Sequence, residues 1–176
     1  MSSIKELRNE IKDDETVVRF LRIYETAQTS VSIPTVQREV ATLHASRKSR
    51  SLTTAKITPA KLQDAILVDM YTRSRLIEIK VLVHRTSELI SSALSAVKKH
   101  VLVNFSEEVR DLASTKGERD QVVDRLFQGA VKLREEMSSL SDEIDMIIKD
   151  IDQASFSLRN TTELLRMVLD RKDSEF

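Results

Sequence analysis

The sequence predicts an all-α protein: a long-helix bundle or coiled coil with a shorter N-terminal helical region. Three observations carry this prediction. The 176 residues include only two Gly and two Pro, so residues that form tight turns are scarce. Charged residues make up 32% of the chain and aromatic residues only 4%, which favours extended helix packing over a compact core. Apolar residues also repeat with a 3.5-residue period from Val123 onward.

Residues 1–46 are predicted to form the N-terminal helical region. Ser3 and Glu6 have the spacing of a capping box, and the apolar residues behind them predict one helix over 3–28. The residue before a proline is disfavoured in a helix, whereas proline itself is favoured in a first turn. Pro34 therefore predicts a break, followed by a second helix that ends near residue 46.

A basic flexible linker is predicted over residues 47–58, and a long-helix region over 59–176. Thr58 is a suitable N-cap and Pro59 a suitable first residue, so a helix is expected to start there and to continue to about residue 103. One face of this helix is expected to be marked by Ile79, Val83, Ile90, Ala93, Val97 and Val101.

The clearest pattern is a heptad repeat that follows two expected breaks. Asn104 is expected to end the long helix, Ser106 to cap a short one, and Gly117 to precede the repeat. Thirteen of the fourteen a and d positions over seven heptads are apolar, which predicts a coiled-coil seam. The residues predicted to form the oligomer seam are Val123, Leu126, Leu133, Met137, Leu140, Ile144, Ile147, Ile151, Leu158, Leu165 and Val168.

Three apolar e positions widen this seam: Phe127, Ile148 and Leu169. A wider stripe is typical of a bundle of three or more helices rather than a two-stranded coil. Two arrangements satisfy it equally. Helices of several chains can cover the stripe, or the long helix over 59–103 can fold back on it within one chain.

Positive and negative charges are separated along the chain, although 28 basic and 28 acidic residues cancel overall. Residues 44–61 hold five Lys or Arg and no acid, while acids concentrate in 142–152. Candidate contacts with phosphates or with an acidic protein surface are Arg47, Lys48, Arg50 and Lys56. No aromatic residue lies among them, so only weak, sequence-independent nucleic-acid binding is expected. A plain connector, or a contact with the 142–152 face of a neighbouring copy, remains open.

The sequence predicts no catalytic residue, cofactor site or metal site, and hence no enzyme. Cysteine is absent, and the three His (44, 84 and 100) are too far apart in sequence to form a metal motif. Asp142, Asp145 and Asp152 can share part of a helix surface, but no glycine turn is present to wrap a cation. A solvated acidic face is the expected role of these carboxylates.

The expected function is that of a non-enzymatic assembly or scaffold protein, which associates with itself or with other helical subunits. The alternative is an oligomeric nucleic-acid-binding accessory protein. In outline the pattern is similar to helical viral packaging, recombination-accessory and scaffolding proteins and to subunits of cellular coiled-coil complexes, without a motif of any one of them. With no secretion signal and no apolar run of about 20 residues, a soluble protein with no membrane partner is expected, either intracellular or within a virion or complex.

Overall fold

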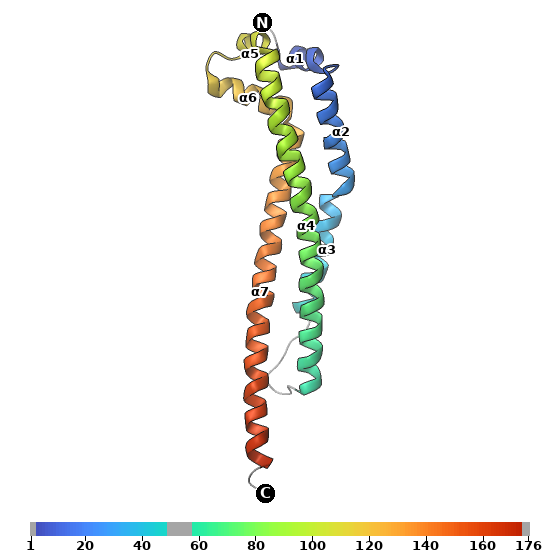
Figure 1. Cartoon of the computed structure of the whole chain (residues 1–176), viewed down its shortest axis with the longest axis vertical. Helices are drawn as coiled ribbons and strands as arrows, with labels where there is room; N and C mark the ends of the chain where they lie inside the picture. The colour runs from blue at the N-terminus through green and yellow to red at the C-terminus, as the bar shows by residue number, and fades with distance from the viewer. Residues whose placement is uncertain (1–2, 49–57, 174–176) are drawn as a thin grey trace. The chain divides into compact units, whose positions relative to one another are not determined.

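The computed structural model describes residues 3–48 and 58–173, which form the helices α1 to α7 (Figure 1). For Lys48, Leu165 and residues 168–173 it describes the backbone alone. No strand occurs within these two ranges. The prediction of an all-α helical bundle is thus confirmed.

The helices form two units, each built from segments that are distant in the sequence. Unit 1 spans residues 1–33 and 82–140, and unit 2 spans 34–81 and 141–176. The two long helices, α4 and α7, each contribute residues to both units. The regions predicted from the sequence (1–46, 47–58 and 59–176) are continuous segments, unlike these units, and that division stays a prediction.

Helix α1 (Ile4–Ile11) starts at the predicted capping box. The hydroxyl of Ser3 accepts a hydrogen bond from the N–H of Glu6, and the Glu6 carboxylate accepts one from the N–H of Ser3 at 2.6 Å. Leu7 and Ile11 are buried, so a single face of this short helix joins the core of unit 1. It packs there against α5 and α6.

Asp14 starts a second helix, α2 (Glu15–Ser30), so the prediction of one continuous N-terminal helix is wrong. Its carboxylate accepts hydrogen bonds from the N–H groups of Thr16 and Val17, at 2.9 and 3.1 Å. Nε2 of His100 lies 3.0 Å from the other carboxylate oxygen. The hydrogen bond from His100 lowers the pKa of Asp14, although partial burial opposes the shift. The acid that interrupts the apolar stripe is therefore an N-cap.

Helix α3 (Ile33–Lys48) begins with proline in its first turn, as predicted, since Pro34 is its second residue. The helix continues beyond the predicted end at residue 46 and includes Arg47 and Lys48. The first of the predicted basic contacts therefore lies on a helix and not in a linker.

Helix α4 (Pro59–Asn104) confirms the predicted long helix, and the Thr58 hydroxyl caps it by accepting a hydrogen bond from the N–H of Lys61 at 3.3 Å. Its buried residues follow one another at spacings of three and four, as the core face of a helix requires. Ala93, predicted to lie on this face, is half-buried, and its neighbour Leu94 is buried in its place. The buried face consists of Leu62, Ala65, Asp69, Thr72, Leu76, Ile79, Val83, Thr86, Ile90, Leu94, Val97 and Val101.

Helix α5 (Ser106–Leu112) follows the predicted break but not the predicted cap. Phe105 occupies the N-cap position and its side chain makes no capping bond, so the assignment of Ser106 as the cap is wrong. The Phe105 carbonyl accepts the N–H of Val109 at 3.1 Å, which continues helical hydrogen bonding almost directly from α4. A capping side chain is not needed at so small an interruption.

Helix α6 (Lys116–Leu126) starts at a second capping box. The Thr115 hydroxyl accepts from the N–H of Glu118, and the Glu118 carboxylate accepts from the N–H of Thr115 at 2.9 Å. Gly117 lies within the first turn of this helix, so the predicted break at that glycine is displaced by a few residues.

A bend at Phe127 separates α6 from α7 (Gln128–Asp173), within the region predicted as one continuous seam helix. Residues of the N-terminal helices hold this bend inside unit 1. Arg8 donates to the carbonyl of Leu126, one of the last carbonyls of α6, at 3.4 Å. The rings of Phe20 and Phe127 meet edge to face, with centroids 5.1 Å apart. Contacts between distant segments therefore set the bend.

Candidate assembly surface

The described residues contain no group of three or more His, Asp or Glu that could hold a metal ion. Of the predicted candidate carboxylates, Asp145 and Asp152 are instead paired with cations of α4. Lys80 lies 2.7 Å from Asp145, and Arg73 donates to Asp152 at 2.7 and 3.4 Å. Both pairs lie within unit 2 and link α4 to α7, so basic and acidic segments of one chain neutralise each other there.

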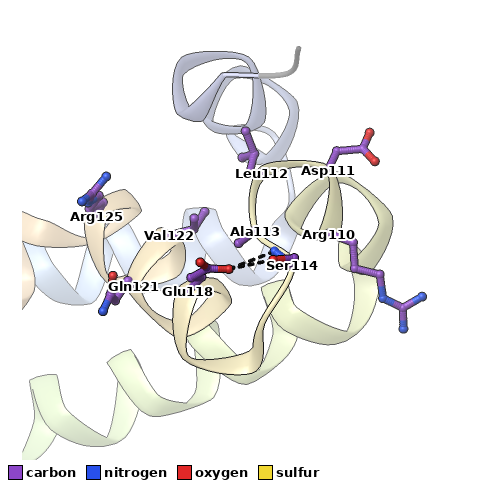
Figure 2. Close-up of a pocket in the computed structure, with 9 residues that line it drawn as sticks. All are labelled: Arg110, Asp111, Leu112, Ala113, Ser114, Glu118, Gln121, Val122 and Arg125. Atoms are coloured by element: carbon purple, nitrogen blue, oxygen red, sulfur yellow. Dashed lines mark hydrogen bonds between the residues drawn. The ribbon is translucent and has the colours of Figure 1, made fainter.

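Figure 2 shows a polar cavity of about 420 Å³ in unit 1, between α5 and the start of α6. Its central carboxylate, Glu118, accepts hydrogen bonds from the N–H groups of Thr115 and Ser114 and from the Ser114 hydroxyl. The bond from Thr115 is the largest cause of a lowered pKa at Glu118, and the hydroxyl of Ser114 adds to it. A carboxylate with a lowered pKa that caps a helix is a poor general base at neutral pH.

The first half of the predicted seam is core within a single chain. In unit 1 the seam residues Val123, Leu126, Leu133, Met137 and Leu140 are buried, as is Ala130 at another a position. In unit 2 the same holds for Ile144, Ile147 and Ile151. Of the apolar e positions, Phe127 is buried and Ile148 half-buried, which agrees with a stripe wider than two helices cover.

The described residues cover the second half of the seam only in part. Ala154, Leu158 and Thr161, at a and d positions, are half-buried, and Leu164, at the adjacent g position, is 63% exposed. We call Ala154, Leu158, Thr161 and Leu164 the open seam. The predicted seam residues Leu165 and Val168 lie on α7, but their side chains are outside the described part of the structure. The heptad pattern thus continues beyond the point at which the described residues cover it fully.

The open seam starts where α3 ends. Arg47, in the last turn of α3, forms an ion pair with Asp69 of α4 at 2.9 Å. The Arg73–Asp152 pair defines the register of the antiparallel helices α4 and α7. A residue that precedes Arg73 by some number of positions is therefore level with the residue that follows Asp152 by the same number. Asp69 is therefore level with about residue 156 of α7 by the equal rise of the two helices. The described part of α3 does not extend beyond that level.

A groove of about 420 Å³ lies beside the open seam in unit 2, between the first turns of α4 and the end of α7. Leu67 lines it and is 56% exposed. A pair of helices with an apolar groove between them is the form of site that receives a third helix. The residues around the groove are Pro59, Leu62, Gln63, Ile66, Leu67, Thr162 and Arg166.

The predicted phosphate contacts fall into two groups. The guanidinium of Arg47 is engaged by Asp69, and both side chains are largely buried, at 13% and 3% exposure. Lys48 ends α3 with its side chain outside the described residues, and Arg50 and Lys56 lie outside them entirely. Arg47 therefore has a structural role that sequence reasoning missed, because its partner is 22 residues away on another helix.

Comparisons of the chain with protein-family models, with curated proteins and with solved structures found no match. Within the described ranges, none of the helices is both long and apolar enough to cross a membrane. Function is therefore inferred from the residues and contacts of this chain alone.

Proposed function

We propose that the protein is a non-enzymatic, α-helical assembly or scaffold protein that uses the open seam to associate with itself or with another helical subunit. One observation carries this proposal. The heptad pattern that forms core up to Ile151 continues past it, where the described seam side chains are only half-buried. Residues with core chemistry and core spacing gain stability only when another surface covers them.

Covering the open seam would contribute favourable free energy to association. Covering a Leu side chain fully contributes about 1.5–3 kcal/mol. Leu158 is already half-buried, so Leu158 and Leu164 together contribute less than twice this free energy. A partner helix would also fill the adjacent groove beside Leu67. The fitting partner is an amphipathic helix, from a second copy or from another subunit.

The open seam is tested by placing charges on it. The variant Leu158→Asp with Leu164→Asp should remain helical, because neither side chain is fully buried. Its mass in light scattering should fall below that of the wild type, since two desolvated carboxylates per chain oppose association by several kcal/mol, on the order of 2–5. Met146→Asp is the matched control: Met146 is 62% exposed on the same helix but is not a seam position.

A double variant that keeps the wild-type mass at all concentrations, while Met146→Asp does the same, would show that the open seam plays no part in self-association. Binding of a different helical subunit through the same surface would then be measured with that subunit and the same pair of variants.

The alternative of nucleic-acid binding rests on Lys48, Arg50 and Lys56, since Arg47 is engaged by Asp69. Replacing these three residues with Gln should leave the fold intact and remove weak, sequence-independent binding at about 50 mM salt. Because each phosphate contact contributes roughly 0.7–0.9 to the dependence of log affinity on log salt, the slope should flatten by about two units or more per copy. Absence of wild-type binding to DNA and RNA at that salt concentration would eliminate this alternative.

A further inference from the structure

Helix α4 has a second apolar face within unit 2. Its buried face includes Leu76 and Ile79, but a different set of residues repeats at spacings of three and four on the side that the unit leaves exposed. Four of the five members are large apolar side chains, with Met70 63% exposed and Leu67 56% exposed. We call this set the outer stripe: Leu67, Met70, Ser74, Ile77 and Val81.

The outer stripe lies largely outside the core of unit 2, since its four apolar side chains are 37–63% exposed. A helix that packs on one side normally carries polar residues on the other. Here the exposed side follows a heptad pattern of its own, with Leu67, Ser74 and Val81 at a positions and Met70 and Ile77 at d positions. The stripe runs for about 21 Å at ~1.5 Å per residue. Such a surface is typical of a helix that packs on both sides.

We propose that the outer stripe docks onto the outer stripe of a second copy, with the two α4 helices parallel and in register. This dimer contact goes beyond the proposed function, because it uses a stripe along α4 of which only Leu67 also lines the groove beside the open seam. A parallel contact between identical stripes is isologous, so the two copies are related by a twofold axis along the helices.

Charge favours the parallel arrangement over the antiparallel one. In a parallel pair, a residue at g faces the e residue of the following heptad in the other chain. Arg73 is at g and Glu78 at e, so Arg73 would face the partner subunit's Glu78. An antiparallel pair centred on Ser74 would instead bring Arg73 close to the partner subunit's Arg73. Opposite charges across such a pair stabilise it, and like charges destabilise it.

Both charged side chains have room for this contact. The Arg73 side chain is 45% exposed, and only two of its nitrogens bind Asp152. Because a guanidinium has five N–H donors, further donors remain for a second carboxylate. The Glu78 side chain is 61% exposed and binds Arg75 through one oxygen, Oε2. The interface covers only two heptads, so a dimer with Kd of about micromolar order is expected.

Disulfide trapping tests the contact directly, because the chain has no cysteine of its own. In the parallel, in-register dimer two copies of residue 70 face each other, within the ~4.4–6.8 Å Cα separation that a disulfide spans. Met70→Cys should therefore form a covalent dimer under mild oxidation, at least ~10-fold more than Gln37→Cys at the same concentration. Gln37 is the control, since it is exposed on α3 in the same unit.

A mixture of Met70→Cys and Ile77→Cys chains separates the two orientations. Parallel chains give only dimers of like variants, whereas dimers containing one chain of each variant would show an antiparallel contact and overturn the proposal. Cross-linking no greater than that of Gln37→Cys would overturn it as well, whatever mass the protein has.

The same Met70→Cys change in the Leu158→Asp, Leu164→Asp background separates this contact from the open seam. Cross-linking should persist there, because Met70, Ile77 and Val81 do not line the groove beside the open seam. If the Leu158→Asp and Leu164→Asp changes abolished the cross-linking of Met70→Cys, the outer stripe would not be an independent interface and the proposal would be overturned.

Discussion

Replacing Ile144 and Ile151 with Asp is expected to unfold unit 2 and not merely to separate chains. Both side chains are fully buried within a single chain, at 0% exposure. A carboxylate placed at such a position has no partner and costs several kcal/mol, about 4 or more for each substitution. This is a large part of the 5–15 kcal/mol that typically stabilises a whole domain.

Urea denaturation followed by circular dichroism measures this effect, with Ile144→Val as the conservative control. That control removes one methylene group and should lower the free energy of unfolding by about 1 kcal/mol. If the double Asp variant unfolded at the wild-type urea concentration and only its mass fell, Ile144 and Ile151 would lie between chains and not inside one.

Replacing Arg47 with Met is expected to lower the free energy of unfolding by about 3 kcal/mol, although Arg47 was predicted from the sequence to be a surface contact. The substitution removes the guanidinium 2.9 Å from Asp69, whose side chain is 3% exposed and sits on the buried face of α4. Breaking a buried ion pair costs more than the pair contributes, because the remaining charge keeps its desolvation penalty.

The matched variant is Arg47→Met combined with Asp69→Leu, which removes both charges and should recover most of the stability lost by Arg47→Met alone. Comparing the single and double variants by urea denaturation isolates the interaction. A single variant as stable as the wild type would show that the Arg47–Asp69 pair does not hold the end of α3 to α4.

Features that depend on neighbouring residues were predictable from the sequence. The caps at Ser3 and Thr58 are local hydrogen bonds between residues three apart, so spacing alone identifies them. Asp14 carried the same type of signal, but the apolar residues on both sides of it favoured one continuous helix. An acid that interrupts an apolar stripe is therefore to be considered as an N-cap before it is treated as a flaw in the pattern.

Features that depend on distant segments were not predictable. The bend at Phe127 follows from contacts with Arg8 and Phe20, more than a hundred residues earlier. The heptad repeat predicted the seam but not the point at which it becomes uncovered. That point depends on where α3 ends and on the register between α4 and α7, which the Arg73–Asp152 pair defines.

The outer stripe was missed for another reason. The run from Leu76 to Val83 is apolar on both sides of the helix, and the buried face also contains Asp69 and Thr72. A search for one apolar face therefore gives a weak pattern, although two faces are present.

The hydroxyl of Thr72 is buried without a hydrogen-bond partner in the described structure, which marks this level of the core as imperfectly matched.

Hydrogen exchange of α7 in the purified chain, measured over a range of protein concentrations, tests the open seam most directly. In dilute protein the amides of residues 154–168 should exchange faster than those of 141–151, because Ala154, Leu158 and Thr161 are only half-buried whereas Ile144, Ile147 and Ile151 are buried. At concentrations where light scattering shows association, protection of residues 154–168 should rise. Two results would contradict the account. Residues 154–168 could be as protected as 141–151 in the monomer, or they could stay unprotected in the oligomer. Either result would show that the open seam is not the assembly surface.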